Sequence, residues 1–182
     1  RKSLDSVKSL IQESGCGVYP ANINSPEQVI VSGDTTSINR FCTYLKDTKN
    51  QFVELNVSHA FHSPVVKSAA DRFSQYLDTV EFKLPRAVVY SNELCKAYPE
   101  NPLEIRRILK NHIIAPVNFA GSIKTLYEEG VRLFIEVGPG AVLSKLTQSI
   151  LSGKDSAVIS INSKDGNEIE SFQKALAQMF VE

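Results

Sequence analysis

Two histidines in one short segment are the residues of this 182-residue chain best suited to chemistry. They lie in Ser58-His59-Ala60-Phe61-His62, where a strand is expected to end, and Ser63-Pro64 follows. Strand ends are where α/β proteins place reacting groups. An imidazole titrates near neutral pH, so it can take a proton from a hydroxyl within hydrogen-bond reach. His62 is therefore a candidate general base, while the local pattern leaves open a histidine with only a structural hydrogen bond.

Three other polar features have simpler structural interpretations. Ser63 is expected to cap a helix rather than act as a nucleophile, because Ser favours the N-cap and Pro the first helical position. The turn Gly138-Pro139-Gly140 lacks the spacing of a phosphate-binding loop, which favours a plain strand-to-helix turn. His112 is expected at a helix end, where the helix dipole mildly favours an imidazolium.

Composition excludes several classes of function. Lys plus Arg and Asp plus Glu each total 20, so no net charge attracts nucleic acid. The apolar runs are far shorter than the roughly 20 residues that span a bilayer, and the polar N-terminal segment has no signal-peptide core. Cys16, Cys42 and Cys95 are scattered without CxxC spacing, so neither a disulfide framework nor a metal site is indicated. These features predict a soluble, cytoplasmic protein without a membrane or nucleic-acid partner.

The first 58 residues predict an incomplete sheet-and-helix unit. Apolar periodicity predicts helices over residues 2–13 and around 38–45, and strands over 17–23, 28–32 and 51–57. The turn residues Asn24-Ser25-Pro26 favour a hairpin between the first two strands. Helix, strand, strand, helix, strand is the order of a ferredoxin-like unit that lacks its first strand. We therefore expect residues 1–58 to form a ferredoxin-like small subdomain without that strand.

From residue 59 onwards the pattern predicts an α/β arrangement with parallel strands. Helices are expected after Ser63-Pro64, over 102–112 and 119–129, and near the C-terminus. Strands are expected over 88–90, 131–137 and 157–161. Two helices have predicted buried faces, namely Val65, Ala69, Phe73, Tyr76 and Leu77 in one and Val142, Leu143, Leu146 and Ile150 in the other.

Four spaced motifs together resemble a known family. They are ANINSPEQVIVSG at 21–33, HAFHSP at 59–64, PVNF at 116–119 and FIEVGPGAVL at 134–143. In this order and spacing they resemble the malonyl-CoA:acyl carrier protein transacylases and the acyltransferase domains of type I polyketide synthases. The resemblance covers essentially the whole chain. It implies that residues 59–182 are the C-terminal part of a large, α/β-hydrolase-like acyltransferase subdomain.

The resemblance also implies a role for His62. It would be the histidine of a Ser-His dyad that moves an acyl group from a coenzyme A thioester, through an acyl-enzyme, to the phosphopantetheine thiol of an acyl carrier protein. A main-chain carbonyl at His112 would orient it, and His59, Asn22 and Asn24 would have supporting roles. No bound cofactor and no metal are implied.

Phe61 bears on the choice of substrate. The HAFH form of the motif resembles the version associated with malonyl selection, in which Phe61 crowds the space of an α-methyl group. Rejection of one methyl is worth only about 1–3 kcal/mol. The resemblance thus implies a preference for malonyl-CoA over methylmalonyl-CoA that is not absolute.

The nucleophile is the missing part of this pattern. The family serine lies in a GxSxG turn, and no GxSxG occurs in the 182 residues. We therefore expect the chain alone to be inactive. Its expected partners are the upstream half of the same domain, neighbouring synthase domains, malonyl-CoA and the carrier protein. Two alternatives stay open: a non-catalytic, carrier-protein-binding remnant, and an acyl hydrolase with the same dyad.

Overall fold

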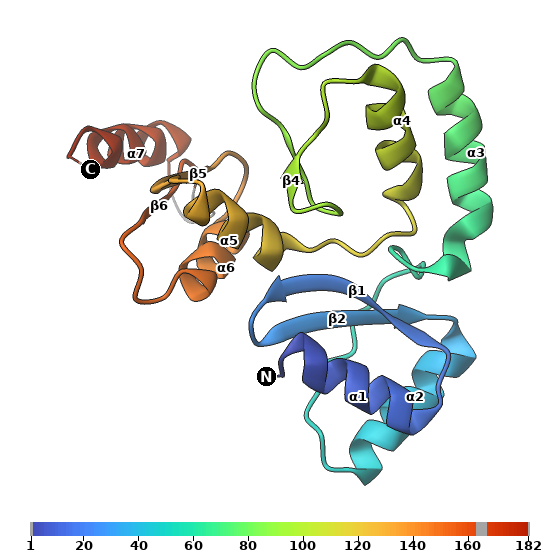
Figure 1. The fold of residues 1–182 in the computed structure, drawn as a ribbon. Coiled ribbons are helices and arrows are strands. Elements are labelled where there is room, and N and C mark those ends of the chain that lie inside the picture. Colours follow the sequence, from blue (N-terminus) through green and yellow to red (C-terminus); the bar gives the residue numbers. More distant parts are fainter. Residues whose placement is uncertain (1, 163–166, 182) are drawn as a thin grey trace. The chain divides into compact units, whose positions relative to one another are not determined.

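The structure is a computed structural model that describes residues 2–162 and 167–181 (Figure 1). Helices alternate with short strands along the chain, as an α/β protein requires. Contacts divide the chain into two compact units, Arg1–Ser122 and Ile123–Glu182. The subdomain division expected after residue 58 rests on the order of the predicted elements, and it stays a prediction.

The first unit begins with two helices and a hairpin, as predicted. They are α1 (Leu4–Ser14), β1 (Val18–Ser25), β2 (Gln28–Gly33) and α2 (Thr35–Asp47). Ser25 pairs with Gln28, which leaves two residues for the turn of the antiparallel hairpin. Val18, Phe41 and Leu45 are buried together and form the core between the hairpin and the helices. The apolar periodicity of this region therefore identified its elements correctly.

Residues 51–57 do not form the predicted strand. The alternating side chains Val53, Leu55 and Val57 are 83%, 50% and 68% exposed. An extended segment becomes a strand only when a neighbour pairs with its N–H and C=O groups. Within the described residues β1 and β2 pair with each other, and no strand pairs with 51–57. The prediction failed because alternation reports a side-chain pattern and not the presence of a partner.

A short 3₁₀ turn, η1 (Pro64–Val66), precedes α3 (Lys67–Asp78). The helix lies where it was predicted, and Leu77 is buried as predicted, but the rest of its buried face differs. Val66, Ala70 and Leu77 are buried, whereas Tyr76 is 63% exposed. A 3₁₀ turn winds more tightly than an α-helix, so it rotates the face that follows.

In the remainder of the first unit a short strand pair precedes a helix that packs against α3. The strands β3 (Tyr90–Ser91) and β4 (Lys96–Ala97) pair antiparallel, and α4 (Pro102–Asn111) follows. Asn101 caps α4, because its side-chain oxygen accepts the N–H groups of Leu103 and Glu104 at 2.9 and 3.4 Å. The Lys110 ammonium lies 2.7 Å from the Asp78 carboxylate, which joins α4 to α3. Both helices were predicted.

The second unit contains a parallel strand pair. The helix α5 (Phe119–Glu128) leads into β5 (Leu133–Glu136), α6 (Val142–Ile150), β6 (Ala157–Ser160) and α7 (Glu168–Val181). The pair β5–β6 is parallel, as the strand-helix-strand order requires. The predicted buried face of α6 is correct only at Ile150, since Ser144 and Thr147 are also buried while Val142 is 63% exposed. The reason is that the strand pair covers only the side of α6 that carries Ser144.

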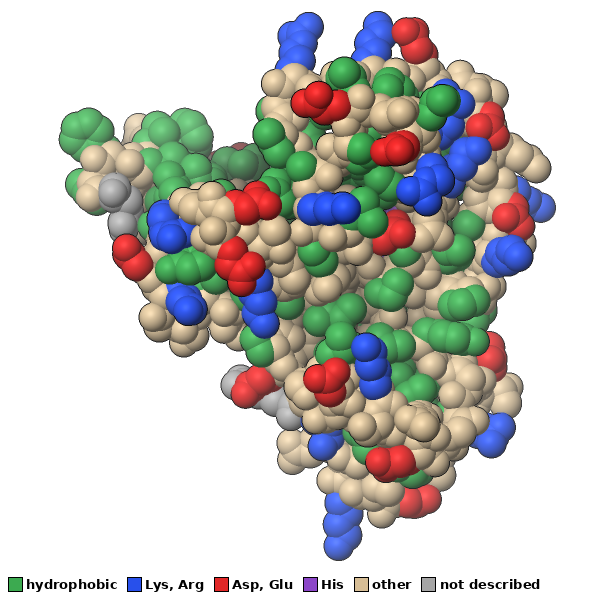
Figure 2. Space-filling model, in the orientation of Figure 1, with side chains coloured by type: hydrophobic (Ala, Val, Ile, Leu, Met, Phe, Trp, Pro, Cys, Tyr) green, Lys and Arg blue, Asp and Glu red, His purple; other side chains and the backbone are tan. Residues whose placement is uncertain are grey.

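Apolar side chains remain exposed in the second unit. Figure 2 shows hydrophobic side chains gathered over α7, where Ile169, Phe180 and Val181 are 68%, 91% and 80% exposed. On the same view, positive and negative side chains are mixed. No helix in the described residues has the length and hydropathy needed to cross a membrane.

Candidate active site

His62 occupies an unusual backbone position just before η1. Its φ is 58°, in the left-handed region that few residues other than glycine adopt. Its N–H donates to the Ile113 carbonyl at 3.0 Å, which ties this position to the segment after α4. A non-glycine residue in this region costs of order 1–3 kcal/mol, so the surrounding contacts must hold it there.

The ring of His62 is oriented by main-chain carbonyl groups. Its Nδ1 lies 3.1 Å from the His112 oxygen and 3.1 Å from the Ala115 oxygen. A carbonyl can only accept, so Nδ1 carries the hydrogen. In the neutral ring this leaves the lone pair on Nε2, which forms no hydrogen bond among the described residues. The geometry therefore presents Nε2 as a proton acceptor.

One of the two carbonyls, that of His112, lies at the C-terminal end of α4, and the other, that of Ala115, lies just beyond it. His112 follows the last residue of that helix, and the N–H groups of Ile114 and Ala115 turn back to the Asn111 carbonyl at 3.0 and 2.9 Å. The last carbonyls of a helix have no partner within it and carry the negative end of the helix dipole. The two carbonyls therefore act as acceptors that fix the ring through Nδ1.

Two serine hydroxyls fix the loop that carries His62. The Ser63 hydroxyl donates to the Ala60 carbonyl at 2.6 Å, and its residue is 0% exposed. The Ser32 hydroxyl, from β2, donates to the Phe61 carbonyl at 3.0 Å. Ser63 makes no side-chain cap hydrogen bond, so the predicted capping bond is wrong, although Pro64 does begin the helical turn. The Ser63 hydroxyl is used instead to close the turn before His62.

The side chain of His112 also lies near His62. The two ring centroids are 6.0 Å apart and the rings meet edge to face. Burial, and then the nearby charge of His62, lower the pKa of His112 below its ordinary value, while Glu93 acts in the opposite direction. Sequence reasoning missed Glu93, because it lies between two short strands with no motif around it.

The other predicted site residues, Asn22, Asn24 and His59, make no hydrogen bond to the His62 ring among the described residues. Asn22 is half-buried in β1 and pairs with Val117, two residues beyond Ala115. No side-chain hydrogen bond of Asn22 or Asn24 is found among the described residues. His59 is exposed, its Nδ1 lies 2.8 Å from the Ser58 hydroxyl, and its ring is 5.8 Å from that of Phe61.

Phe61 is 55% exposed beside His62. Its carbonyl is anchored by Ser32, as described above, while its ring remains open to an approaching molecule.

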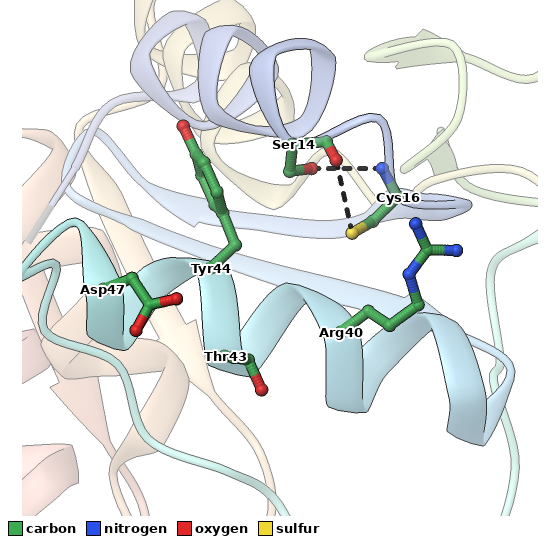
Figure 3. Close-up of a pocket in the computed structure, with 6 residues that line it drawn as sticks. All are labelled: Ser14, Cys16, Arg40, Thr43, Tyr44 and Asp47. Atoms are coloured by element: carbon green, nitrogen blue, oxygen red, sulfur yellow. Dashed lines mark hydrogen bonds between the residues drawn. The ribbon is translucent and has the colours of Figure 1, made fainter.

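A hollow of about 330 Å³ opens elsewhere on the first unit, between α1 and α2 (Figure 3). Its lining residues are Ser14, Cys16, Arg40, Thr43, Tyr44 and Asp47. Figure 3 shows Ser14, the last residue of α1, hydrogen-bonded to Cys16. The Cys16 N–H donates to the Ser14 hydroxyl, and the Cys16 thiol donates to the Ser14 carbonyl. None of the predicted site residues lies in this hollow.

In the second unit, the carboxylate of Glu136, at the end of β5, binds the N-terminus of α6. The two oxygens of Glu136 accept the N–H groups of Leu143 and Ser144 at 3.1 and 2.7 Å. The first N–H groups of α6 are therefore not free to hold a phosphate. Burial opposes ionisation, but hydrogen bonds from Ser144 and Leu143 outweigh it and lower the pKa of Glu136. Among the described residues no cluster of His, Cys, Asp or Glu is arranged to hold a metal ion.

Comparison with known proteins agrees with this α/β fold. The acyl transferase domain family matches residues 3–182. The chain is 33% identical over 150 residues to the malonyl CoA-acyl carrier protein transacylase of Bacillus subtilis (strain 168), covering 82% of this chain and 47% of that protein.

Solved structures agree as well. The acyltransferase domain from the second module of the salinomycin polyketide synthase aligns with a TM-score of 0.88 at 30% identity, over 99% of this chain and 42% of that one. A malonyl-transacylase in complex with its type II polyketide synthase acyl-carrier protein aligns with a TM-score of 0.85 at 28% identity, over 98% of this chain and 56% of that one.

These matches define the class as an α/β acyltransferase. The chain belongs to the acyl transferase domain family. It spans about half the length of the free-standing transacylases that it matches.

Proposed function

We propose that this chain is part of an acyltransferase that moves a malonyl-type unit from coenzyme A to the phosphopantetheine thiol of an acyl carrier protein. The observation that carries the proposal is the ring of His62. Its Nδ1 is held at 3.1 Å by each of two carbonyls, and Nε2 is left as an acceptor. Membership of the acyl transferase domain family supports acyl transfer as the reaction in which this nitrogen accepts a proton.

In this proposal His62 moves one proton in each half-reaction. Nε2 takes the proton of a serine hydroxyl while the serine oxygen attacks the thioester carbonyl. The carbon–sulfur bond breaks, the coenzyme A sulfur leaves with the proton from His62, and an acyl-serine ester remains. The carrier thiol then gives its proton to Nε2 and attacks the ester carbonyl, and the proton returns to the serine oxygen as it leaves.

The serine of the proposed dyad comes from outside these 182 residues, which contain no GxSxG. We propose the upstream half of the same domain as its source. The exposed Val53, Leu55 and Val57 support this partner, because an alternating run with no neighbour is suited to pair with another strand. In this view residues 1–58 are an incomplete ferredoxin-like subdomain and residues 59–182 are part of the large subdomain.

Selectivity for malonyl over methylmalonyl is proposed to rest on Phe61. Its ring is 55% exposed and lies within the loop that carries His62. A branched acyl group that reaches His62 would meet this ring. The preference is expected to be modest, because exclusion of one methyl is worth about 1–3 kcal/mol. The carrier protein, coenzyme A thioesters and adjoining synthase domains are the proposed partners in the cytoplasm.

Acyl transfer to water is the second candidate reaction. The same histidine would serve a hydrolase, because the proton acceptor is indifferent to whether a thiol or water receives the acyl group. The relative bound to an acyl-carrier protein favours the carrier thiol as acceptor. A scaffold without chemistry would not need a ring whose Nδ1 is fixed and whose Nε2 is left open.

Labelling with radioactive malonyl-CoA tests the proposal. The 182-residue chain alone is expected to bind no label covalently. The chain joined to the serine-bearing half is expected to form a labelled ester, and His62→Gln should slow its formation by about 10²–10⁴-fold. Tyr76→Gln, on the exposed side of α3, is the matched control.

An unchanged rate in His62→Gln would remove His62 from the reaction. Discharge of the label is then followed with and without holo carrier protein. Label on the carrier supports transfer, and equal release of free malonate in both cases supports hydrolysis instead.

A further inference from the structure

The peptide unit between Phe61 and His62 joins the two side chains that the proposed reaction uses. Its carbonyl belongs to Phe61 and its N–H belongs to His62. The N–H donates to the Ile113 carbonyl at 3.0 Å, and the carbonyl accepts the Ser32 hydroxyl at 3.0 Å. Among the described residues no other hydrogen bond to either group is found. The orientation of this peptide plane therefore depends on one contact at each of its polar ends.

The backbone conformation that these two contacts hold is strained. The φ of His62 is 58°, which a non-glycine residue keeps only where its surroundings enforce it. Rotation of the peptide plane changes ψ of Phe61 and φ of His62 together, and it would return His62 to a negative φ. The same rotation would turn the N–H away from Ile113 and the carbonyl away from Ser32. The two hydrogen bonds thus oppose a rotation that relief of strain favours.

Ser32 is a firmly held anchor for this peptide unit. It lies in β2, opposite Tyr19 of β1 in the ladder of the hairpin. The two strands approach each other closely here, since a Cβ on Gly33 would lie 3.0 Å from the Val18 side chain and 3.1 Å from the Gly17 carbonyl oxygen. The Ser32 hydroxyl is therefore presented by a paired strand, whereas the peptide unit that it binds lies outside any strand or helix.

The Phe61 ring depends on this backbone contact because packing does not fix it. The ring is 55% exposed, and its aromatic neighbour, His59 at 5.8 Å, is exposed as well. The position of an exposed side chain follows the backbone that carries it. A hydrogen bond at the Phe61 carbonyl thus has a direct effect on where the ring lies.

We propose that Ser32 is a positioning residue whose hydroxyl holds the peptide unit between Phe61 and His62 in its strained orientation. Both rings leave the backbone in directions set by that unit. Without the hydroxyl, Ile113 alone opposes the rotation, and the peptide unit samples the relaxed orientation too. The Phe61 ring then leaves the place where it would meet a branched acyl group, and Nε2 of His62 is in place for less of the time.

The alternative is a Ser32 that only ties β2 to the loop. Such a tie would contribute to stability, but its loss would change neither φ of His62 nor the relative rates with two acyl groups. A positioning role must change φ even where the fold is intact. The two roles are therefore separated by a measurement of the His62 backbone.

Nuclear magnetic resonance provides this measurement on the chain itself, because the coupling between the amide and α protons of His62 depends on φ. The coupling is compared in the wild type, Ser32→Ala, Ser32→Thr and Ser9→Ala. Threonine keeps a hydroxyl at position 32 and is the rescue variant. Ser9 is the matched control, since its hydroxyl also donates to a main-chain carbonyl, that of Asp5 at 3.2 Å, in an exposed contact.

The proposal expects the coupling of His62 to increase in Ser32→Ala, because the coupling is larger for an extended backbone than at φ 58°. Ser32→Thr and Ser9→Ala should keep the wild-type value. An unchanged coupling in Ser32→Ala overturns the proposal. An increase that Ser32→Thr does not reverse, or that Ser9→Ala shares, overturns it equally, since the hydroxyl would then not be the cause.

The chemical consequence rests on the proposed function and is tested in the chain joined to its serine-bearing half. Loading rates with malonyl-CoA and methylmalonyl-CoA are compared in the wild type, Ser32→Ala and Phe61→Ala. Ser32→Ala should raise the methylmalonyl-to-malonyl ratio by up to about 10-fold, the lower end of what exclusion of one methyl gives.

The Phe61→Ala variant separates the two proposals. If it raises the ratio and Ser32→Ala does not, the influence of Ser32 on selectivity is refuted. If Phe61→Ala leaves the ratio unchanged, the proposed role of Phe61 fails, and the coupling of His62 still decides whether Ser32 positions the peptide unit.

Discussion

The loop at His62 and the turn at Glu136 place an ionisable side chain in the same kind of position, just before a helix. Glu136 accepts the first N–H groups of its own helix, so both of its oxygens are satisfied at 3.1 and 2.7 Å. His62 is instead held by carbonyls of another segment, and only one of its nitrogens is used.

The difference teaches how to separate a structural group from a reactive one. A carboxylate whose hydrogen bonds are completed within its own strand-turn-helix unit stabilises that unit and has little left to offer a substrate. A ring that is oriented on one side and open on the other is prepared for proton transfer. The sequence signals of the two were similar, since each stands two residues before a proline or a glycine that precedes or begins a helix.

The largest expected effect is on the rate of acyl transfer when the ring is removed. His62→Gly and His62→Ala, in the chain joined to its serine-bearing half, should both be slowed by about 10²–10⁴-fold. The glycine variant should be more stable than the alanine variant by about 1 kcal/mol, because only glycine adopts φ 58° without strain. Urea unfolding of both variants checks this order, and equal stabilities would contradict the strain.

Ser63→Ala is the next largest change. It removes the 2.6 Å bond to the Ala60 carbonyl at a site that is 0% exposed, and should cost about 1–3 kcal/mol of unfolding free energy. Ser68→Ala, on the exposed side of α3, is the control. If both variants unfold at the same urea concentration, the Ser63 hydroxyl does not hold the loop.

Glu136→Gln should destabilise the second unit by about 1 kcal/mol, a reduced value because water screens the carboxylate. A lowered pKa means that the stabilisation by Glu136 is present above the ordinary value of 4.5 and is lost as the pH falls through the folded pKa. Amide exchange in α6 of the wild type should therefore speed up in acid relative to that in the glutamine variant. Parallel pH profiles in the two proteins would contradict the role of this carboxylate.

The smallest effect is expected at Ser32. Its hydroxyl bonds the Phe61 carbonyl at 3.0 Å, but the contact is exposed, so Ser32→Ala should cost about 0.5 kcal/mol. A larger loss, measured by the same urea unfolding, would mean that β2 holds the His62 loop more firmly than this one bond accounts for.

The local elements were largely predictable because their causes are local. The hairpin followed from the apolar pattern and its turn residues, and the helix expected over residues 102–112 was found as α4. The strand predicted over residues 51–57 is absent, because a strand forms only where a second strand lies beside it, and the sequence of the segment does not show whether one does. The buried faces of α3 and α6 were predicted correctly only at Leu77 and Ile150, because a 3₁₀ turn and a two-stranded layer decided which side is covered.

The candidate site was predictable only in part. His62 was found because its motif is compact and matches a family, and the main-chain carbonyl at His112 was implied by the same resemblance. Glu93, whose charge acts on His112, was not found, because it lies 19 positions before His112, between two short strands. Contacts between distant segments leave no trace in a single sequence.

The backbone at residue 62 has a consequence for how this protein can change over time. A left-handed position is one that glycine fills at no steric cost and asparagine at little cost. Selection for stability alone would therefore favour glycine or asparagine over histidine at this position. In copies of this domain that have lost their reaction, drift towards glycine or asparagine at position 62 is the expected mark of released selection.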